Sequence, residues 1–152
     1  MPQTIVDTQF GRLAITQDGD AITRVTWGDV DHISTTALLS EAIQQLTAYD
    51  AGELTAFDLP LAVTGHALQR AVCAAMSAIP HGETRTYGDI AKEVSASAQA
   101  VGQACGGNPI PVIIPCHRVM GSGGKLVGFS GAGGVETKVA LLRHERVAGL
   151  LI

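Results

Sequence analysis

Hydrophobic and polar residues alternate along the first part of the chain with the two-residue period of a β-strand. In the segment from Gly11 to Gln17, this alternation places Leu13 and Ile15 on one face. A turn of sequence Asp-Gly-Asp separates this segment from a second alternating stretch, residues 21–27. The pattern therefore predicts strands within residues 4–27 that are joined by a tight turn.

The hydrophobic period becomes helical after residue 34. Thr35 or Thr36 can cap a helix that ends at an Asp-Ala-Gly sequence. Further along, Pro60 lies in a short extended piece and favours the edge of a sheet, because proline has no backbone donor. We therefore expect a small α+β unit over residues 1–64, and we interpret it as a scaffold. The apolar positions of its helix are Leu39, Ala42, Ile43, Leu46 and Tyr49.

Helical patterns dominate the rest of the chain. A helix is predicted over residues 66–79, where Pro-His-Gly follows. The spacing of Thr86 and Asp89 is that of a capping box, so a short helix should begin there. Residues 98–106 predict another short helix, built of small residues. Two short helices joined by a tight turn are typical of a helix-turn-helix, although plain close packing between helices gives the same pattern.

The C-terminal end is rich in glycine and then becomes helical again. Residues 121–128 predict a turn-rich hairpin that can act as a wing, and residues 129–134 a loop that lines a pocket or simply connects two elements. A last helix is expected over residues 135–147, and the second domain therefore extends over residues 65–152. The fold class is α+β. The apolar face of the last helix is expected to contain Val135, Val139 and Leu142.

Charge is distributed unevenly between the two predicted domains, although the formal net charge is only −4. Residues 1–64 carry two basic and nine acidic residues, a net of −7, whereas residues 65–152 carry eight basic and five acidic residues, a net of +3. The basic half is compatible with a bound polyanion such as DNA, and equally with ordinary surface charge. Gln99 and Gln103 stand in the second short helix, where a recognition helix typically carries Arg or Lys.

Composition excludes several other classes of protein. No apolar run approaches eighteen residues, so no membrane span or membrane partner is expected, and the N-terminus lacks the pattern of a secretion signal. The three cysteines, Cys73, Cys105 and Cys116, contain no Cys-x-x-Cys pair, which argues against a disulfide framework and a structural zinc site. Reduced thiols fit a cytoplasmic location, or a nuclear one if the source is eukaryotic.

Candidate chemistry is concentrated in the segment from Asn108 to Arg118, which is interrupted by three prolines. Proline fixes φ and removes backbone donors, so this segment is poorly suited to a helix or a central strand and is expected to be a stiff carrier. At its end it presents Cys116 and His117 beside Arg118. A thiol next to a potential base and a cation is the composition of a nucleophile site.

These residues resemble a known family. The sequence Ile-Pro-Cys-His-Arg-Val at residues 114–119, preceded by Gly-Asn-Pro and followed by Gly-Phe-Ser-Gly at 128–131 and Leu-Leu-Arg-His-Glu at 141–145, resembles the O6-alkylguanine-DNA alkyltransferases. Residues 79–91 fit the same family. The resemblance covers nearly the whole chain and is strongest over residues 65–147. It implies a ribonuclease-H-like N-terminal unit followed by a mainly helical, winged helix-turn-helix domain.

The activity implied by this resemblance is a single-turnover DNA repair reaction. The protein would bind double-stranded DNA, flip out an O6-alkylguanine or O4-alkylthymine, and transfer the alkyl group irreversibly to Cys116. Flipping is needed because O6 lies within a stacked base pair. The resemblance implies a monomer that needs no cofactor and no metal.

Site residues follow from the resemblance position by position. His117 would act through a bridging water as the base that yields the Cys116 thiolate, and Glu145 would orient His117. Asn108 would join the recognition helix to the active-site turn, and Arg118 would brace the structure. The implied pocket residues are Tyr87, Val119, Phe129, Ser130 and Gly131, and the implied DNA-binding residues are Thr86, Tyr87, Ala98, Gln99, Ala100, Gly102 and Arg118.

The chain departs from the family pattern at four places. Gln99 stands where the family usually has the Arg that enters the base stack, and Phe129 replaces a common pocket Tyr. Leu68 and Cys73 replace a usual Phe and Trp, and the zinc ligands of some relatives are missing.

Two alternative functions follow from these departures. Gln99 is compatible with a lesion-binding protein that does not transfer the alkyl group, although relatives of that kind have Trp in place of Cys116. The other alternative is a winged-helix transcription regulator. The missing basic recognition helix and the acidic N-terminal half argue against it.

Overall fold

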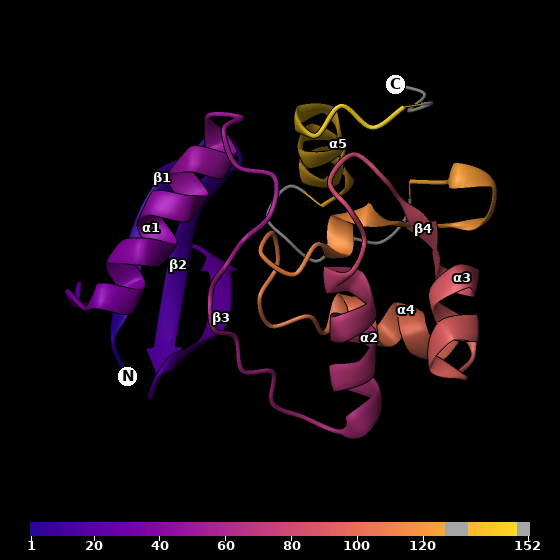
Figure 1. Ribbon diagram of the computed structural model, residues 1–152, viewed down its shortest axis with the longest axis horizontal. Coiled ribbons are helices and arrows are strands. Elements are labelled where there is room, and N and C mark those ends of the chain that lie inside the picture. Colours follow the sequence, from indigo (N-terminus) through magenta and orange to yellow (C-terminus); the bar gives the residue numbers. More distant parts are fainter. Residues whose placement is uncertain (127–133, 149–152) are drawn as a thin grey trace. The chain divides into compact units, whose positions relative to one another are not determined.

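The structure is a computed structural model, and it describes residues 1–126 and 134–148. The chain divides into two compact units, Met1–Val63 and Thr64–Ile152, which are described separately below. The first unit contains a β-sheet with one helix, and the second is mainly helical (Figure 1). The α+β fold class predicted from the sequence is therefore confirmed.

The N-terminal unit is a three-stranded antiparallel sheet in the order β1-β2-β3, with α1 lying along one face (Figure 1). Leu13 and Ile15 are fully buried, as the alternation predicts. Thr36 caps α1 by accepting a hydrogen bond from the Leu39 backbone. Of the apolar positions expected inside, Ile43 alone is only half-buried. The elements are β1 (Gln3–Thr8), β2 (Gly11–Asp18), β3 (Ala21–Trp27) and α1 (Ala37–Asp50).

The segment that contains Pro60 lies at the edge of this sheet, as expected. It forms a single parallel bridge, in which Leu61 pairs with Ile22 of β3. The Ile22 amide donates to the Pro60 carbonyl at 2.8 Å, and the Ala62 amide donates to the Ile22 carbonyl at 3.0 Å. Proline is tolerated here because only its carbonyl takes part in the pairing.

Three helices, α2, α3 and α4, pack against one another in the C-terminal unit (Figure 1). The two-residue strands β4 and β5 pair in parallel and thereby connect the start of α3 to the chain that follows Cys116. The elements of this unit are α2 (Ala67–Ser77), β4 (Arg85–Thr86), α3 (Tyr87–Val94), α4 (Ala98–Gly106), the 3-10 turn η1 (Cys116–Arg118), β5 (Val119–Met120), the 3-10 turn η2 (Ser122–Gly124) and α5 (Val135–His144).

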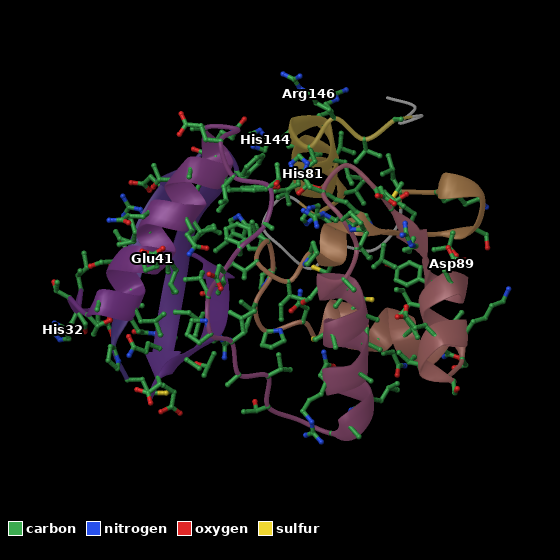
Figure 2. All side chains as sticks on the ribbon, viewed as in Figure 1. His32, Glu41, His81, Asp89, His144 and Arg146 are labelled. Carbon is green, nitrogen blue, oxygen red and sulfur yellow. The ribbon has the colours of Figure 1, made fainter. Side chains whose placement is uncertain are left out.

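The pair α3–α4 has the local signals of a helix-turn-helix. Thr86 and Asp89 form the predicted capping box, and Asp89 lies at the start of α3 (Figure 2). Ser95 ends α3 in the left-handed conformation, with φ of 56°, and Ser97 caps α4 by accepting from the Ala100 backbone. The left-handed residue turns the chain sharply, so that the second helix begins three residues later, at Ala98.

The structure bears on two expectations for the C-terminal end, and it corrects the second. In the described part of the predicted hairpin, Gly121 and Lys125 form one antiparallel bridge, and the turn η2 lies between them. Gly123 and Gly124 allow this turn because both adopt positive φ. The last helix ends at His144, three residues earlier than predicted.

The predicted inner face of this helix is confirmed at Leu142, half-buried at Val139 and wrong at Val135. Val135 is 41% exposed, whereas Lys138, Leu141 and Leu142 are fully buried. The buried face thus begins with a lysine, which the apolar pattern could not indicate.

Candidate active site

Asn108 organises the loop that leads to Cys116. Its side-chain nitrogen donates to the Ile114 carbonyl at 2.9 Å, and its side-chain oxygen accepts from the Ile110 amide at 3.0 Å. The Ile114 amide in turn donates to the Ile110 carbonyl at 2.8 Å. Residues 108–114 therefore fold back on themselves, a reversal that the expectation of a stiff carrier did not include.

The turn in this loop is made by Val112, whose φ is +73°. A β-branched residue rarely adopts this conformation, and such backbone strain costs roughly 1–3 kcal/mol. Val112 is nevertheless buried. The hydrogen bonds of Asn108 and the packing of the loop therefore hold the strained residue in place.

Cys116 opens η1, and its thiol is buried. Burial raises the pKa of this thiol, while a hydrogen bond with Asn108 and the charge of Lys138 act in the opposite direction. The cysteine backbone is fixed by a hydrogen bond of 2.8 Å from its amide to the Ile114 carbonyl. A buried thiol at a fixed position needs neighbouring groups to form the reactive thiolate.

His117, Arg118 and Glu145 form a buried hydrogen-bonded cluster. The distance between His117 Nε2 and Glu145 Oε2 is 2.7 Å, and the Arg118 guanidinium donates to both carboxylate oxygens, at 2.7 and 3.1 Å. A third guanidinium nitrogen donates to the Ile79 carbonyl at 2.6 Å. Glu145 lies immediately after α5 as its C-cap, so the helix end sets the position of the carboxylate.

This cluster fixes the protonation state of His117. A carboxylate only accepts hydrogen bonds, so the neutral imidazole must carry its proton on Nε2. Burial lowers the pKa of His117 despite the opposing effect of Glu145, and the ring is therefore neutral at pH 7. Within the described part of the chain, no protein atom hydrogen-bonds its other nitrogen, Nδ1. That lone pair is available to accept a proton.

Glu145 remains ionised because of its partners. Burial alone would raise its pKa, but the hydrogen bonds from His117 and Arg118 outweigh burial and hold the pKa well below its usual value. Arg118 is buried by the same contacts. These contacts to Glu145 and to the Ile79 carbonyl are those of a bracing side chain, the role expected for Arg118.

His81 lies near α5 (Figure 2), where the charges of Glu145 and Arg118 act on it. Burial lowers its pKa, and the charge of Glu145 acts against that shift. Sequence analysis assigns no role to His81. Its position makes it part of the electrostatic surroundings of Glu145.

Tyr87 follows β4, and Val119 begins β5 three residues after Cys116. Arg85 pairs with Val119, so the start of α3 is held beside the residues that follow Cys116. Burial raises the pKa of Tyr87, and the nearby thiols of Cys105 and Cys116 raise it further. The phenol therefore stays protonated at neutral pH and can donate a hydrogen bond.

Sequence analysis misses one residue of this site, Lys138. Its side chain is fully buried, and its amine donates to the Val119 carbonyl and lies 5.9 Å from the centre of the Tyr87 ring. Burial lowers its pKa, while Cys116 and Cys105 raise it. Lys138 does precede Leu141, Leu142 and Glu145 at helical spacing, but a search for apolar residues cannot select a lysine for the buried face.

The residues predicted to contact DNA lie on α3 and α4, apart from Arg118. Gln99 is exposed, and Gly102 lies one turn further along the same face of α4. A Cβ added at Gly102 would meet no described atom within 4 Å. This face of α4 is therefore open and without charge. Thr86 and Tyr87 open α3, Ala98 and Ala100 lie in the first turn of α4, and the predicted pocket residues Phe129, Ser130 and Gly131 lie outside the described residues.

A pocket of about 120 Å³ lies on another side of α4, between α2 and α4. It contains none of the residues around Cys116, so it is separate from the site described above. The residues that line this pocket are His66, Leu68, Gln69, Ala100, Gln103 and Ala104.

Among the described residues, no group of three or more His, Cys, Asp or Glu side chains can hold a metal ion, and no helix has the length and apolar character needed to cross a membrane.

Comparison with known proteins defines the class to which this fold and site belong. The family model described as the ribonuclease-like domain of 6-O-methylguanine DNA methyltransferase matches residues 1–63, and the model of the DNA binding domain of the same family matches residues 67–147. The chain belongs to the 6-O-methylguanine DNA methyltransferase family.

Individual relatives agree with this assignment. A methylated-DNA–protein-cysteine methyltransferase of Mycobacterium leprae is 40% identical over 93% of this chain and 90% of its own length. The corresponding protein of Mycolicibacterium paratuberculosis is 51% identical over 69% of this chain, a match that spans only 64% of that relative. The crystal structure of Mycobacterium tuberculosis OGT in complex with DNA matches with a TM-score of 0.86 and 41% identity, covering 96% of this chain and 93% of that one.

Proposed function

We propose that this protein repairs alkylated DNA by transferring the alkyl group from O6-alkylguanine to Cys116 in a single, irreversible turnover. The observation that carries this proposal is the contact of 2.7 Å by which Glu145 orients His117, the residue after Cys116, while no described protein atom hydrogen-bonds the Nδ1 of that ring. Relatives named methylated-DNA–protein-cysteine methyltransferase support the same reaction. O4-alkylthymine is a second substrate of the same chemistry.

The reaction requires a thiolate and a leaving base that does not keep its negative charge. His117 Nδ1 accepts the thiol proton, directly or through a bridging water, and Glu145 stabilises the imidazolium that forms. The Cys116 sulfur then bonds to the alkyl carbon while the bond from that carbon to O6 breaks. Tyr87, whose raised pKa keeps its hydroxyl protonated, is suited to donate a proton to the departing guanine.

Access to the base requires that DNA binds and that the damaged nucleotide leaves the stack. We assign DNA binding to the helix-turn-helix formed by α3 and α4, with the small, uncharged face around Gln99 and Gly102 entering the groove. Residues 65–152 then form the DNA-binding and transfer domain, and residues 1–64 the scaffold domain. We place the protein in the cytoplasm as a monomer.

Intact-protein mass spectrometry tests the proposed reaction directly. After incubation with a duplex containing O6-methylguanine, the protein should gain the mass of one methyl group, and peptide mapping should locate it on Cys116. An unmodified duplex and a Cys116→Ser variant serve as controls and should show no gain. Tight binding to the lesion without any mass gain would instead support a lesion-binding protein, and the absence of any preference for the lesion would support a transcription regulator.

Gln99 provides a prediction about base flipping. Gln99→Arg adds a positive charge to the exposed face of α4, where it can fill the stack and pair with phosphate. We expect transfer from duplex DNA to become faster by about threefold to tenfold, because a contribution of about 1 kcal/mol changes a rate to this extent. Transfer from free O6-methylguanine base should be unchanged, and an equal acceleration on both substrates would contradict a role in flipping.

A further inference from the structure

Lys138 occupies an unusual position for a lysine. Its side chain is fully buried, although it belongs to α5, whose other charged residues Glu136 and Arg143 are exposed. Lysine is almost never fully buried unless its charge has a partner or a function. The position of this amine inside the site, rather than at the protein surface, therefore requires an explanation.

Four titratable groups face the amine from the elements packed around it. Tyr87 comes from α3, Cys105 from α4, and Cys116 and His117 from η1. A hydrogen bond of 2.5 Å to the Val119 carbonyl fixes the amine in this position. The Val119 carbonyl is only three residues beyond the reactive cysteine, so the charge is held at a constant place relative to the thiol.

We infer that Lys138 is a positioning residue whose ammonium charge stabilises the thiolate of Cys116 and thereby sets the pH range in which the cysteine is reactive. The inference deepens the proposed function, on which it rests, because a thiolate is the species that attacks the alkyl group. Charges within a buried site interact much more strongly than charges in water, since few solvent dipoles screen them.

The charge of Lys138 favours the thiolate of Cys116 and also that of the second thiol nearby, Cys105. Burial raises the pKa of Cys105 to about 12, so this thiol remains protonated across the physiological range. Cys116 has the hydrogen bond with Asn108 in addition to the charge of Lys138, and both favour its thiolate. His117, which is neutral, can remove the proton but supplies no charge before it does so.

His117 and Lys138 have different roles in forming the thiolate, and these roles follow from their geometry. His117 provides an acceptor for the proton, and Lys138 provides the field in which the resulting anion is stable. Loss of His117 should slow proton removal, whereas loss of Lys138 should shift the pH at which the anion forms. The two roles therefore predict different changes in a pH profile.

The test measures the alkylation of Cys116 by iodoacetamide as a function of pH, with peptide mass spectrometry to separate Cys116 from the other cysteines. Lys138→Met keeps most of the volume and removes the charge, and we expect it to raise the midpoint of the profile by at least about one pH unit, which is about a tenfold lower rate at pH 7. Lys138→Arg should keep the midpoint near that of the wild type. Lys92→Met removes a charge from an exposed position of α3 and should leave the midpoint unchanged.

A second variant separates charge from folding. Lys138→Gln keeps a donor for the Val119 carbonyl and loses the charge, so it should shift the midpoint as Lys138→Met does. An unshifted midpoint in a folded Lys138→Gln or Lys138→Met protein overturns the inference. Because iodoacetamide needs neither DNA nor base flipping, this outcome is independent of whether the wild type accepts a methyl group from O6-methylguanine.

Discussion

Glu145→Gln is expected to destabilise the protein by about 3–5 kcal/mol, the usual effect of removing one partner from a buried ion pair. The wild-type carboxylate accepts hydrogen bonds from His117 and Arg118, and both partners are buried. Glutamine has no charge and offers one acceptor oxygen, so the buried guanidinium loses its counter-charge. The carbonyl of Ile79 satisfies only one of its nitrogens.

Urea unfolding at pH 7 measures this effect, with two-state analysis of the C-terminal transition. A matched variant, Glu93→Gln, changes an exposed carboxylate of α3 and should alter the free energy of unfolding by no more than about 0.5 kcal/mol. A Glu145→Gln protein that is as stable as the Glu93→Gln variant would show that the pair of Glu145 and Arg118 does not stabilise the fold.

The stability of the wild type and that of Glu145→Gln should also respond differently to acid pH. The pKa of Glu145 is lower in the folded state than its ordinary value of 4.5, so the stability it contributes is complete above that pH and is lost as pH falls below it. The wild type should therefore lose more stability than Glu145→Gln between pH 4.5 and pH 3. Equal losses in the two proteins would contradict the low pKa.

The family could be predicted from the sequence because short segments carry its motifs. The capping box at Thr86 and Asp89 is a local pattern, and it forms as predicted. The motif around Cys116 and His117 is equally local. Its partner Glu145 is 28 residues away, and only the resemblance to a family brings it to the same site, where the structure places it.

Other features depend on tertiary packing and could not be predicted in the same way. The prolines between Asn108 and Cys116 predict a stiff segment, but the reversal at Val112 depends on two hydrogen bonds of the Asn108 side chain. A β-branched residue gives no sign in the sequence that it will adopt positive φ.

Lys138 is a second feature, this time in a helix, that the local sequence pattern could not predict. The apolar pattern selects Val135 for the buried face, yet the structure buries Lys138 and exposes Val135. A search for apolar residues at helical spacing cannot identify an inner face that begins with a cation and ends with Glu145. Both charged positions belong to the site, and this explains why local pattern and tertiary structure disagree at this helix.

His117→Gln is expected to lower the rate of methyl transfer by about 10²-fold to 10⁴-fold at pH 7, the usual contribution of a positioned general base. Gln can keep a hydrogen bond to Glu145 but cannot accept the thiol proton as an imidazole does. The defect should become smaller as pH rises, because hydroxide then ionises Cys116 without help. Single-turnover transfer to Cys116 over a range of pH measures this directly, and His32→Gln, in a loop of the N-terminal unit (Figure 2), is a matched control.

The same variant also tests the buried, neutral state of His117. Its pKa in the folded protein is lower than the ordinary 6.5. As the pH falls, the unfolded chain therefore binds a proton at a higher pH than the folded protein does, and the free energy of unfolding decreases. His81 acts in the same direction and remains in both proteins. His117→Gln should therefore lose less stability than the wild type between pH 6.5 and pH 5. A variant that transfers methyl groups at the wild-type rate and keeps the wild-type pH dependence of stability would assign the base to another group.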